Sequence, residues 1–155
     1  MTGRGVEISP VRYEEIIAHC QREWPKEACG ILAGVRPPRL IPPGGPGQLL
    51  VESRRVIRVY PMRNVEGSPI GYRMDPKEQL HVERDMRHNN QQMLGIYHSH
   101  TASDAYPSSV DVRLAISPDI SYVLISLKDQ ARPVLKSYTI DGTRVEDEHV
   151  WIGGL

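Results

Sequence analysis

The segment IYHSHTASDAYPSSVD, at positions 96–111, gathers side chains that could bind a metal ion. His98 and His100 are two residues apart, so both imidazoles would point to the same face of a β-strand. Asp111, expected in the first turn of the helix that follows, is the candidate for a third ligand. Two histidines and one carboxylate leave a coordination position open for water, which is typical of a catalytic rather than a structural zinc site.

Each part of this pattern also has an ordinary structural explanation. A His-x-His pair on a strand is a weak signal by itself. Ser108 and Asp111 are spaced as an N-cap serine and an acidic residue at N3, close to a capping box, and an acid there suits the helix dipole. Two histidines and a carboxylate also fit a non-haem Fe(II) oxygenase, and a serine near histidine and aspartate could be a nucleophile.

The elements around these residues favour a sheet with helices packed on it. The two histidines end an apolar stretch that reads as a central strand, and such strand ends are where open α/β sheets place their sites. The apolar run in EACGILAG, at 27–34, indicates a buried strand. Ser-Pro at 9–10 and Asp-Pro at 75–76 each combine an N-cap residue with proline at the first helical position.

The whole chain, 1–155, is expected to form one α/β (α+β) domain with a mixed sheet. In order, the sequence predicts a strand at 6–8, a helix at 10–24, a strand within 27–34, a Pro/Gly-rich loop or insertion at 36–48, one or two strands at 49–62, a short strand at 72–74, a helix at 76–89, a strand at 92–100, a short helix at 108–116, a strand at 122–127 and a C-terminal hairpin over about 134–150 that turns at Asp-Gly.

The composition limits the partners of the chain. It holds 19 Lys plus Arg and 19 Asp plus Glu, so its formal net charge is zero and no basic footprint for nucleic acid or an anionic membrane is expected. No stretch resembles a signal peptide or is long and apolar enough to span a bilayer, so we expect the cytoplasm. In that reducing compartment Cys20 and Cys29 are expected to be free thiols.

The complete spacing of His98, His100, Ser108 and Asp111 resembles the H-x-H-x7-S-x2-D motif of the JAMM (MPN+) metalloprotease family. That family also carries a glutamate after its first helix and just before a buried strand, and Glu27 in PKEACGIL stands at this place. The order of elements over 6–140 is also similar to the MPN fold, a cytidine-deaminase-like mixed β-sheet flanked by helices.

The resemblance implies a role for each of these residues. His98, His100 and Asp111 would bind one Zn2+ ion. Glu27 would act as general base on a water molecule and pass its proton to the leaving amine, while Ser108 would hydrogen-bond the tetrahedral oxyanion. Zinc is preferred over iron because an oxygenase has no need of Glu27 and Ser108 in these roles. Ser108 as a nucleophile is disfavoured, because it would need activation by a histidine that already binds the metal.

The substrate is expected to be a small protein. Many deubiquitinases of the family carry proline where this chain has Thr101, and the segments HSHTASDAYPS, EACGILAG and GYRMDPKEQL look more like the compact bacterial Mec-type members. This resemblance implies a peptidase that releases cysteine or another amino acid from a ubiquitin-like sulfur carrier protein. Isopeptidase action on other small-protein conjugates, and a non-catalytic MPN scaffold, are the alternatives.

By the same resemblance, the segment that holds Asn64, Tyr72 and Arg73 would flank a groove for the extended tail of the carrier. Main-chain hydrogen bonds in such a groove can hold a Gly-Gly end that has no side chains. The alternative is that this segment is only a surface loop.

Overall fold

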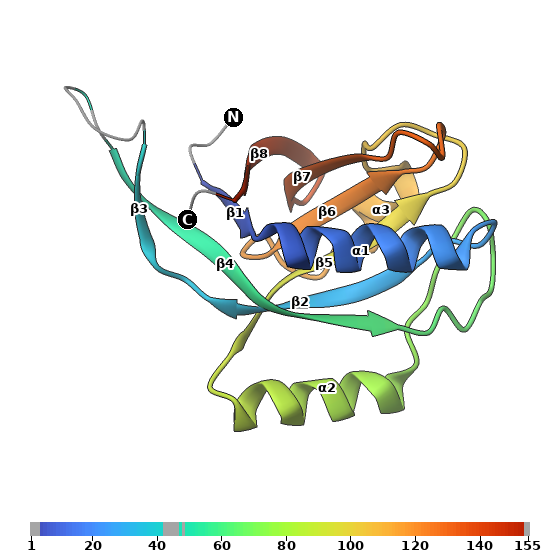
Figure 1. Cartoon of the computed structure of the whole chain (residues 1–155), viewed down its shortest axis with the longest axis horizontal. Helices are drawn as coiled ribbons and strands as arrows, with labels where there is room; N and C mark the ends of the chain where they lie inside the picture. The colour runs from blue at the N-terminus through green and yellow to red at the C-terminus, as the bar shows by residue number, and fades with distance from the viewer. Residues whose placement is uncertain (1–3, 42–46, 48, 154–155) are drawn as a thin grey trace.

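The computed structural model describes residues 4–41, 47 and 49–153 of the chain (Figure 1). The elements are β1 (Gly5–Ile8), α1 (Pro10–Glu23), β2 (Cys29–Val35), β3 (Pro38–Ile41), β4 (Leu49–Met62), α2 (Pro76–His88), β5 (Gln92–His100), α3 (Ser109–Arg113), β6 (Ser121–Ser126), β7 (Val134–Asp141) and β8 (Arg144–Ile152). This alternation of strands and helices agrees with the fold class expected from the sequence.

Among the described residues, the strands form one sheet in the order β1-β8-β7-β6-β5-β2-β4-β3. β1 runs parallel to β8 and also pairs in parallel with β4, so the sheet curves back on itself. β5 and β6 are parallel as well, and the remaining pairs are antiparallel. The sheet is therefore mixed, as expected.

The helices α1 and α2 cover opposite faces of the sheet (Figure 1). α1 begins where the hydroxyl of Ser9 accepts the amide of Arg12, and it buries Ile16 and Ile17 against Tyr97 and neighbouring core residues. α2 begins at the Asp75 cap and packs a second cluster on the other face. Each helix lies on the sheet through one apolar stripe, because its remaining surface faces water.

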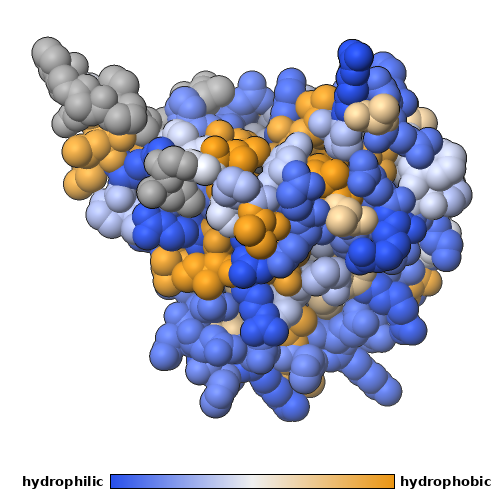
Figure 2. All heavy atoms as spheres, in the orientation of Figure 1, coloured by the Kyte–Doolittle hydropathy of each residue, from blue (hydrophilic) through white to orange (hydrophobic). Residues whose placement is uncertain are grey.

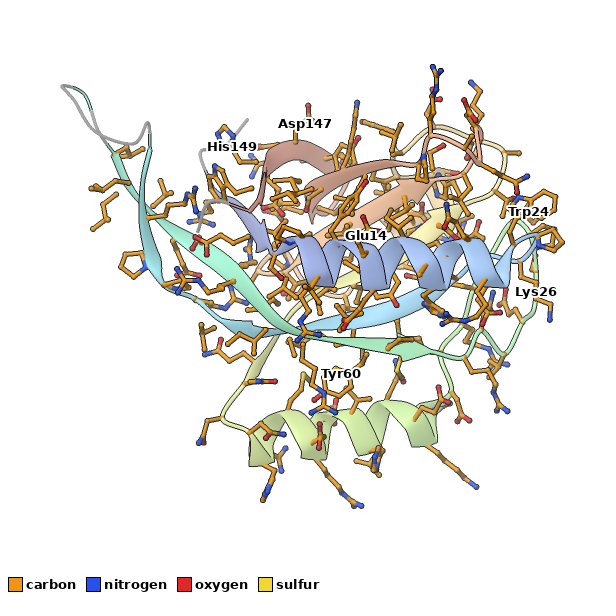
Figure 3. All side chains as sticks on the ribbon, in the orientation of Figure 1. Glu14, Trp24, Lys26, Tyr60, Asp147 and His149 are labelled. Atoms are coloured by element: carbon orange, nitrogen blue, oxygen red, sulfur yellow. The ribbon has the colours of Figure 1, made fainter. Side chains whose placement is uncertain are left out.

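The contact of α2 with the sheet is partly polar. Tyr60 extends from β4 toward α2 (Figure 3) and donates its hydroxyl hydrogen to Asp85 at 2.5 Å. The outer face of α2, at the bottom of Figure 2, is covered mostly by hydrophilic residues. This helix is therefore fixed on one side only and leaves its other side to solvent.

The side chains of β5 alternate between the two faces of the sheet. Tyr97 packs in the cluster under α1, while Ile96 packs in the cluster on the α2 side. Because side chains alternate along a strand, His98 and His100 share the α2 side with Ile96. The buried His19 of α1 supports β5 from behind, since its Nδ1 lies 2.7 Å from the Tyr97 hydroxyl.

The interpretation of 36–48 as a loop is wrong in part, since Pro38–Ile41 forms β3 and pairs with residues 49–52 of β4. Arg39 anchors this strand to the rest of the sheet, because it binds the buried carboxylate of Glu7 at 2.9 Å and lies over the ring of Trp151. β3 is an edge strand, where a proline without an amide hydrogen is tolerated. Residues 42–46 and 48 of the expected insertion lie outside the described residues.

Two further boundaries differ from the sequence expectation. α3 ends at Arg113 rather than near 116, because the amides of Ile116 and Ser117 donate to the Tyr122 hydroxyl instead of continuing the helix. The expected strand at 72–74 is reduced to an isolated bridge between Asn64 and Met74. The C-terminal hairpin is confirmed and extends to residue 152.

No helix among the described residues is long and apolar enough to cross a membrane.

Gly30 lies opposite Tyr97 in the β2–β5 pairing, and a Cβ at position 30 would overlap the tyrosine ring. We expect Gly30→Ala to lower the free energy of unfolding by about 1–3 kcal/mol, because overpacking displaces a ring in a filled core. Urea denaturation measures the change. Gly71→Ala is the control, since its added Cβ meets only the flexible end of Glu66. Equal stabilities for the two variants would contradict the tight packing of Tyr97.

Candidate metal centre

Three side chains of metal-binding type meet at the end of β5. One ligand atom from each of His98, His100 and Asp111 can be chosen so that all three lie within 4.8 Å of one another. His98 Nε2 is 3.2 Å from Asp111 Oδ1, and His100 Nε2 is 3.0 Å from Asp111 Oδ2. The carboxylate therefore faces both imidazoles, one with each oxygen.

The carboxylate of Asp111 is fixed by the start of α3. The Ser108 amide donates to its Oδ2 at 2.8 Å, and the Asp111 amide donates to the Ser108 hydroxyl at 3.1 Å. Burial raises the pKa of Asp111, but its hydrogen bond with His100 and the closeness of His98 outweigh the effect of burial and hold the pKa well below its usual range. A low pKa favours the charged carboxylate, which is the form that can bind a metal ion, and the expected capping box is present together with the metal-type geometry.

His100 is oriented through its second ring nitrogen. Its Nδ1 lies 2.9 Å from the backbone carbonyl oxygen of Asp104, so Nδ1 carries the hydrogen and Nε2 is left to face Asp111. Burial lowers the pKa of His100, but the Asp111 carboxylate and the Asp104 carbonyl outweigh it and raise the pKa above its ordinary value. Positive charge at Nε2 is therefore favoured.

His98 is buried without a hydrogen bond. Neither of its ring nitrogens has a partner of suitable geometry among the described residues, although Nε2 is close to Asp111. Burial lowers the pKa of His98, against the opposing effect of Asp111, which favours the neutral ring. A neutral imidazole with a free lone pair is the form that binds a metal ion.

The donor set fits a Zn2+ ion. Nitrogen and oxygen ligands at about 2.0–2.2 Å from a tetrahedral zinc lie roughly 3.3 Å apart, close to the separations of Asp111 from the two histidines. A cation would also use the unpartnered nitrogen of His98 and the charge of Asp111. The three residues expected from the sequence are thus brought together in a way that suits a metal.

Glu27 stands next to this centre. β2 pairs with β5 so that Cys29 faces His98, and the bond from the Ser99 amide to the Ala28 carbonyl continues the pairing, which places Glu27 opposite His100. The side chain is 6% exposed. Burial raises its pKa to about 7, against the influence of His100, and the negative charge of Asp111 adds to the rise.

The hydroxyl of Ser108 has one interaction fixed and one open. Its oxygen accepts the Asp111 amide, which uses a lone pair and leaves the hydroxyl hydrogen available. Ser108 also lines a cavity of about 200 Å³ together with His98 and Asp111. The hydroxyl can therefore donate to an oxygen that binds beside the candidate ligands.

The cavity is largely apolar. Its wall combines the loop before α2 with α3 and the floor of the sheet, and includes Ile70, Tyr72, Met74, Ile96, Leu114 and Leu124. An engineered cavity of about 150 Å³ holds a benzene molecule, so this one has room for a side chain of moderate size. Ile70, which also lines the cavity, is 89% exposed.

The segment expected to flank a substrate groove is ordered by Asn64. Its amide nitrogen donates to the carbonyls of Glu27 and Gly71, and its oxygen accepts the amide of Arg73, among others. Tyr72, between the last two, lies against His98, while the side chain of Arg73 is exposed. The sequence indicated the segment but not this internal use of Asn64. Contact of these residues with a substrate stays a prediction.

Two features of the centre carry no sequence signal. The Asp104 carbonyl that orients His100 is a backbone group, which any residue could supply. The contact of Tyr72 with His98 joins positions distant in the sequence.

Cys20 and Cys29 are buried and free, and burial raises both thiol pKa values to about 12, so neither is a reactive thiolate.

The model of the family Prok-JAB, prokaryotic homologs of the JAB domain, matches residues 10–141. The chain is also 45% identical to the CysO-cysteine peptidase of Mycobacterium tuberculosis, over 87% of this chain and 82% of the relative. The chain therefore belongs to the prokaryotic JAB family, and the resemblance to JAMM/MPN proteins is confirmed.

A more distant relative is the desampylase of Haloferax volcanii, 27% identical over 81% of this chain and 84% of its own. The solution structure of a Desulfitobacterium hafniense protein matches with a TM-score of 0.80 and 40% identity, covering 96% of this chain and 92% of that one. A JAB1/MPN domain protein of Archaeoglobus fulgidus matches with a TM-score of 0.57 and 14% identity, over 96% and 98% of the two chains. The MPN fold expected from the sequence is confirmed.

The raised pKa of Glu27 predicts a pH-dependent effect of Glu27→Gln on the stability of the protein in chelator. Between pH 4.5 and about 7 the folded chain keeps a proton that the unfolded chain has lost, so the contribution of Glu27 to stability falls as pH rises through this window. Glutamine has no such loss. We expect the variant to gain stability over wild type between pH 5 and 8, by on the order of 3 kcal/mol, in urea denaturation.

Adding Zn2+ is the control for this experiment, because a nearby dication lowers the pKa of Glu27 and should shrink the difference between the two proteins. A stability difference that does not change with pH in chelator would show that the Glu27 carboxyl titrates normally.

Proposed function

We propose that the chain is a zinc-dependent metallopeptidase that cleaves after the C-terminal glycine of a ubiquitin-like sulfur carrier protein and releases cysteine or another amino acid. The observation that carries the proposal is the meeting of three ligand-type side chains, including the unpartnered His98, next to the buried carboxyl of Glu27. A merely structural zinc site would need no such carboxyl, and it would close the fourth position.

His98, His100 and Asp111 would hold the ion, with the Asp104 carbonyl and the Ser108 amide orienting two of them. When bound, Zn2+ polarises the scissile carbonyl and lowers the pKa of a water molecule toward ~7. The apolar cavity beside the three residues would keep bulk water away from the bond that is cleaved.

Glu27 would take a proton from the attacking water, since a general base works best when its pKa lies near the working pH. The same carboxyl then gives this proton to the leaving amine as the C–N bond breaks. One water is consumed, and the products are a carboxylate and a free amine. Ser108 would donate its hydroxyl hydrogen to the oxygen that gains negative charge.

The name of the Mycobacterium tuberculosis relative supports the substrate, because that protein is a CysO-cysteine peptidase and shares 45% identity with this chain. An extended Gly-Gly tail would lie along the segment from Asn64 to Arg73, where backbone groups can bind a chain without side chains. The buried free thiols suit a reducing compartment, so we expect the protein to act in the cytoplasm.

The desampylase relative favours a second candidate function, isopeptidase action on conjugates of small ubiquitin-like proteins. The chemistry at the centre would be the same, because both reactions hydrolyse an amide after a C-terminal glycine. The two functions differ in the leaving amine, which is a free amino acid in one case and a lysine side chain in the other.

The proposal is tested by mass spectrometry of a sulfur carrier that ends in Gly-Gly-Cys, incubated with the zinc-loaded protein. We expect the carrier to lose the mass of one cysteine, and chelator to abolish the loss. His100→Ala should lose both zinc and activity. Glu27→Gln should keep zinc and lose activity by about 10²–10⁴-fold, because it removes the proton carrier.

A carrier left intact by a protein that binds one zinc would refute the cysteine-releasing function, and a lysine-linked conjugate then tests the isopeptidase. Near wild-type hydrolysis by Glu27→Gln would refute its role as the base.

Ser108→Ala should lower kcat by about 10²–10³-fold with a smaller effect on KM, because the lost donor acts on the charge of the transition state. Ser108→Gly is the matched control for the cap, since glycine is a tolerated N-cap residue. Both variants should fold and bind zinc. Activity within a factor of two of wild type in Ser108→Gly would contradict the oxyanion role.

A further inference from the structure

We propose that Tyr72 is a positioning residue for the candidate metal ligand His98, and that its ring replaces the hydrogen-bonded partner that a metal-binding histidine usually has. The inference rests on the proposed zinc site, but it concerns a residue outside the ligand set and the proton transfer. It also gives Tyr72 a role other than the substrate contact expected from the sequence.

The two histidines are held in different ways. His100 has the Asp104 carbonyl 2.9 Å from its Nδ1, which is the usual arrangement for a metal ligand. His98 has no such partner, because its Nδ1 is buried and makes no hydrogen bond among the described residues. A histidine ring turns broadly about its outer torsion, so an imidazole without a polar partner must be oriented by packing.

Tyr72 supplies that packing. Its ring centroid lies 4.7 Å from that of His98, and the two planes are tilted by 32°. His100 contacts the same imidazole differently, at 5.1 Å and 63°. Rotation of the His98 ring would drive its atoms into the tyrosine ring. Tyr72 therefore holds the imidazole in the plane in which Nε2 can face Asp111.

Tyr72 is itself fixed from two directions. Its side chain packs against the apolar cluster between the sheet and α2, which includes Met74. Its backbone is held by Asn64, which donates to the carbonyl of Gly71 and accepts the amide of Arg73, the residues on either side. A ring anchored in this way can resist the rotation of its neighbour.

The Asn64 amide also donates to the Glu27 carbonyl at 2.9 Å. The Asn64 side chain thus fixes the position of the loop that holds Tyr72 relative to the backbone of Glu27, the proposed base. The orientation of His98 and the position of Glu27 depend on the same short segment, although neither belongs to it.

Zinc affinity in the absence of substrate tests the proposal, measured by competition with a chromophoric chelator on the full chain. Tyr72→Phe keeps the ring and should bind zinc within about twofold of wild type. Tyr72→Leu removes the ring and should bind about 10–100-fold more weakly, which is the usual cost of losing an outer partner of a ligand. Tyr72→Met is a second variant without a ring, and its flexible side chain can fill the space.

Arg73→Ala is the matched control in the same loop, since its side chain is exposed, and its zinc affinity should equal that of wild type. Far-UV circular dichroism of each chelated protein verifies folding. If Tyr72→Leu unfolds, Tyr72→Met and Tyr72→Phe still separate the effect of the ring from that of the fold.

Wild-type zinc affinity in both Tyr72→Leu and Tyr72→Met would overturn the proposal. If these variants keep that affinity and only raise KM for the carrier, Tyr72 is a substrate contact instead. Failure of the wild-type protein to bind zinc at all would instead overturn the proposed function. The two failures are therefore distinct.

Discussion

The carboxylate of Asp111 connects the parts of the centre. Its Oδ1 faces His98, and its Oδ2 faces His100 and also accepts the Ser108 amide. The chain topology makes this possible. β5 and β6 are parallel, so the chain must leave the end of β5 and travel back before β6 begins, and α3 lies in that connection. A capped first turn then presents the aspartate to the strand that the chain has just left. Sheet topology, helix capping and metal-type geometry are thus parts of one arrangement.

Without a bound cation, the buried polar groups of this centre lower the stability of the folded chain. His98 buries ring nitrogens that make no hydrogen bond, and such groups cost about 1–3 kcal/mol each. Glu27 is buried beside another acid, which is why its pKa is raised to about 7. The imidazoles and the Ser108 amide favour the charged form of Asp111 against the effect of burial. A cation bound here would offset all three costs, so metal affinity and fold stability are coupled.

Local patterns were enough to predict which side chains the structure brings together at the end of β5. The spacing of His98, His100, Ser108 and Asp111 falls within one strand and the next helical turn, and both periods can be read from the chain. Contacts between distant segments could not be read in this way. β3 depends on Arg39 reaching Glu7, α3 ends because the hydroxyl of Tyr122 takes its next amides, and Tyr72 reaches His98 from a separate loop. Glu7 and His98 are far from their partners in sequence, whereas Tyr122 is only six residues beyond Ile116 but belongs to the next strand, so no local period predicts any of the three contacts.

The two parallel pairings of β1 have a consequence for how the molecule assembles. Residues 5–8 pair with 149–152 at one side and residues 5–7 with 53–55 at the other, so the first strand closes a loop that spans almost the entire described chain. Contacts of such sequence separation raise the contact order and slow folding. During synthesis β1 leaves the ribosome long before β8 exists, and the backbone groups on one edge of β1 must wait for that partner. The closing of the sheet is therefore a late event, and the histidine-bearing strand at its centre can pair with β2 well before it.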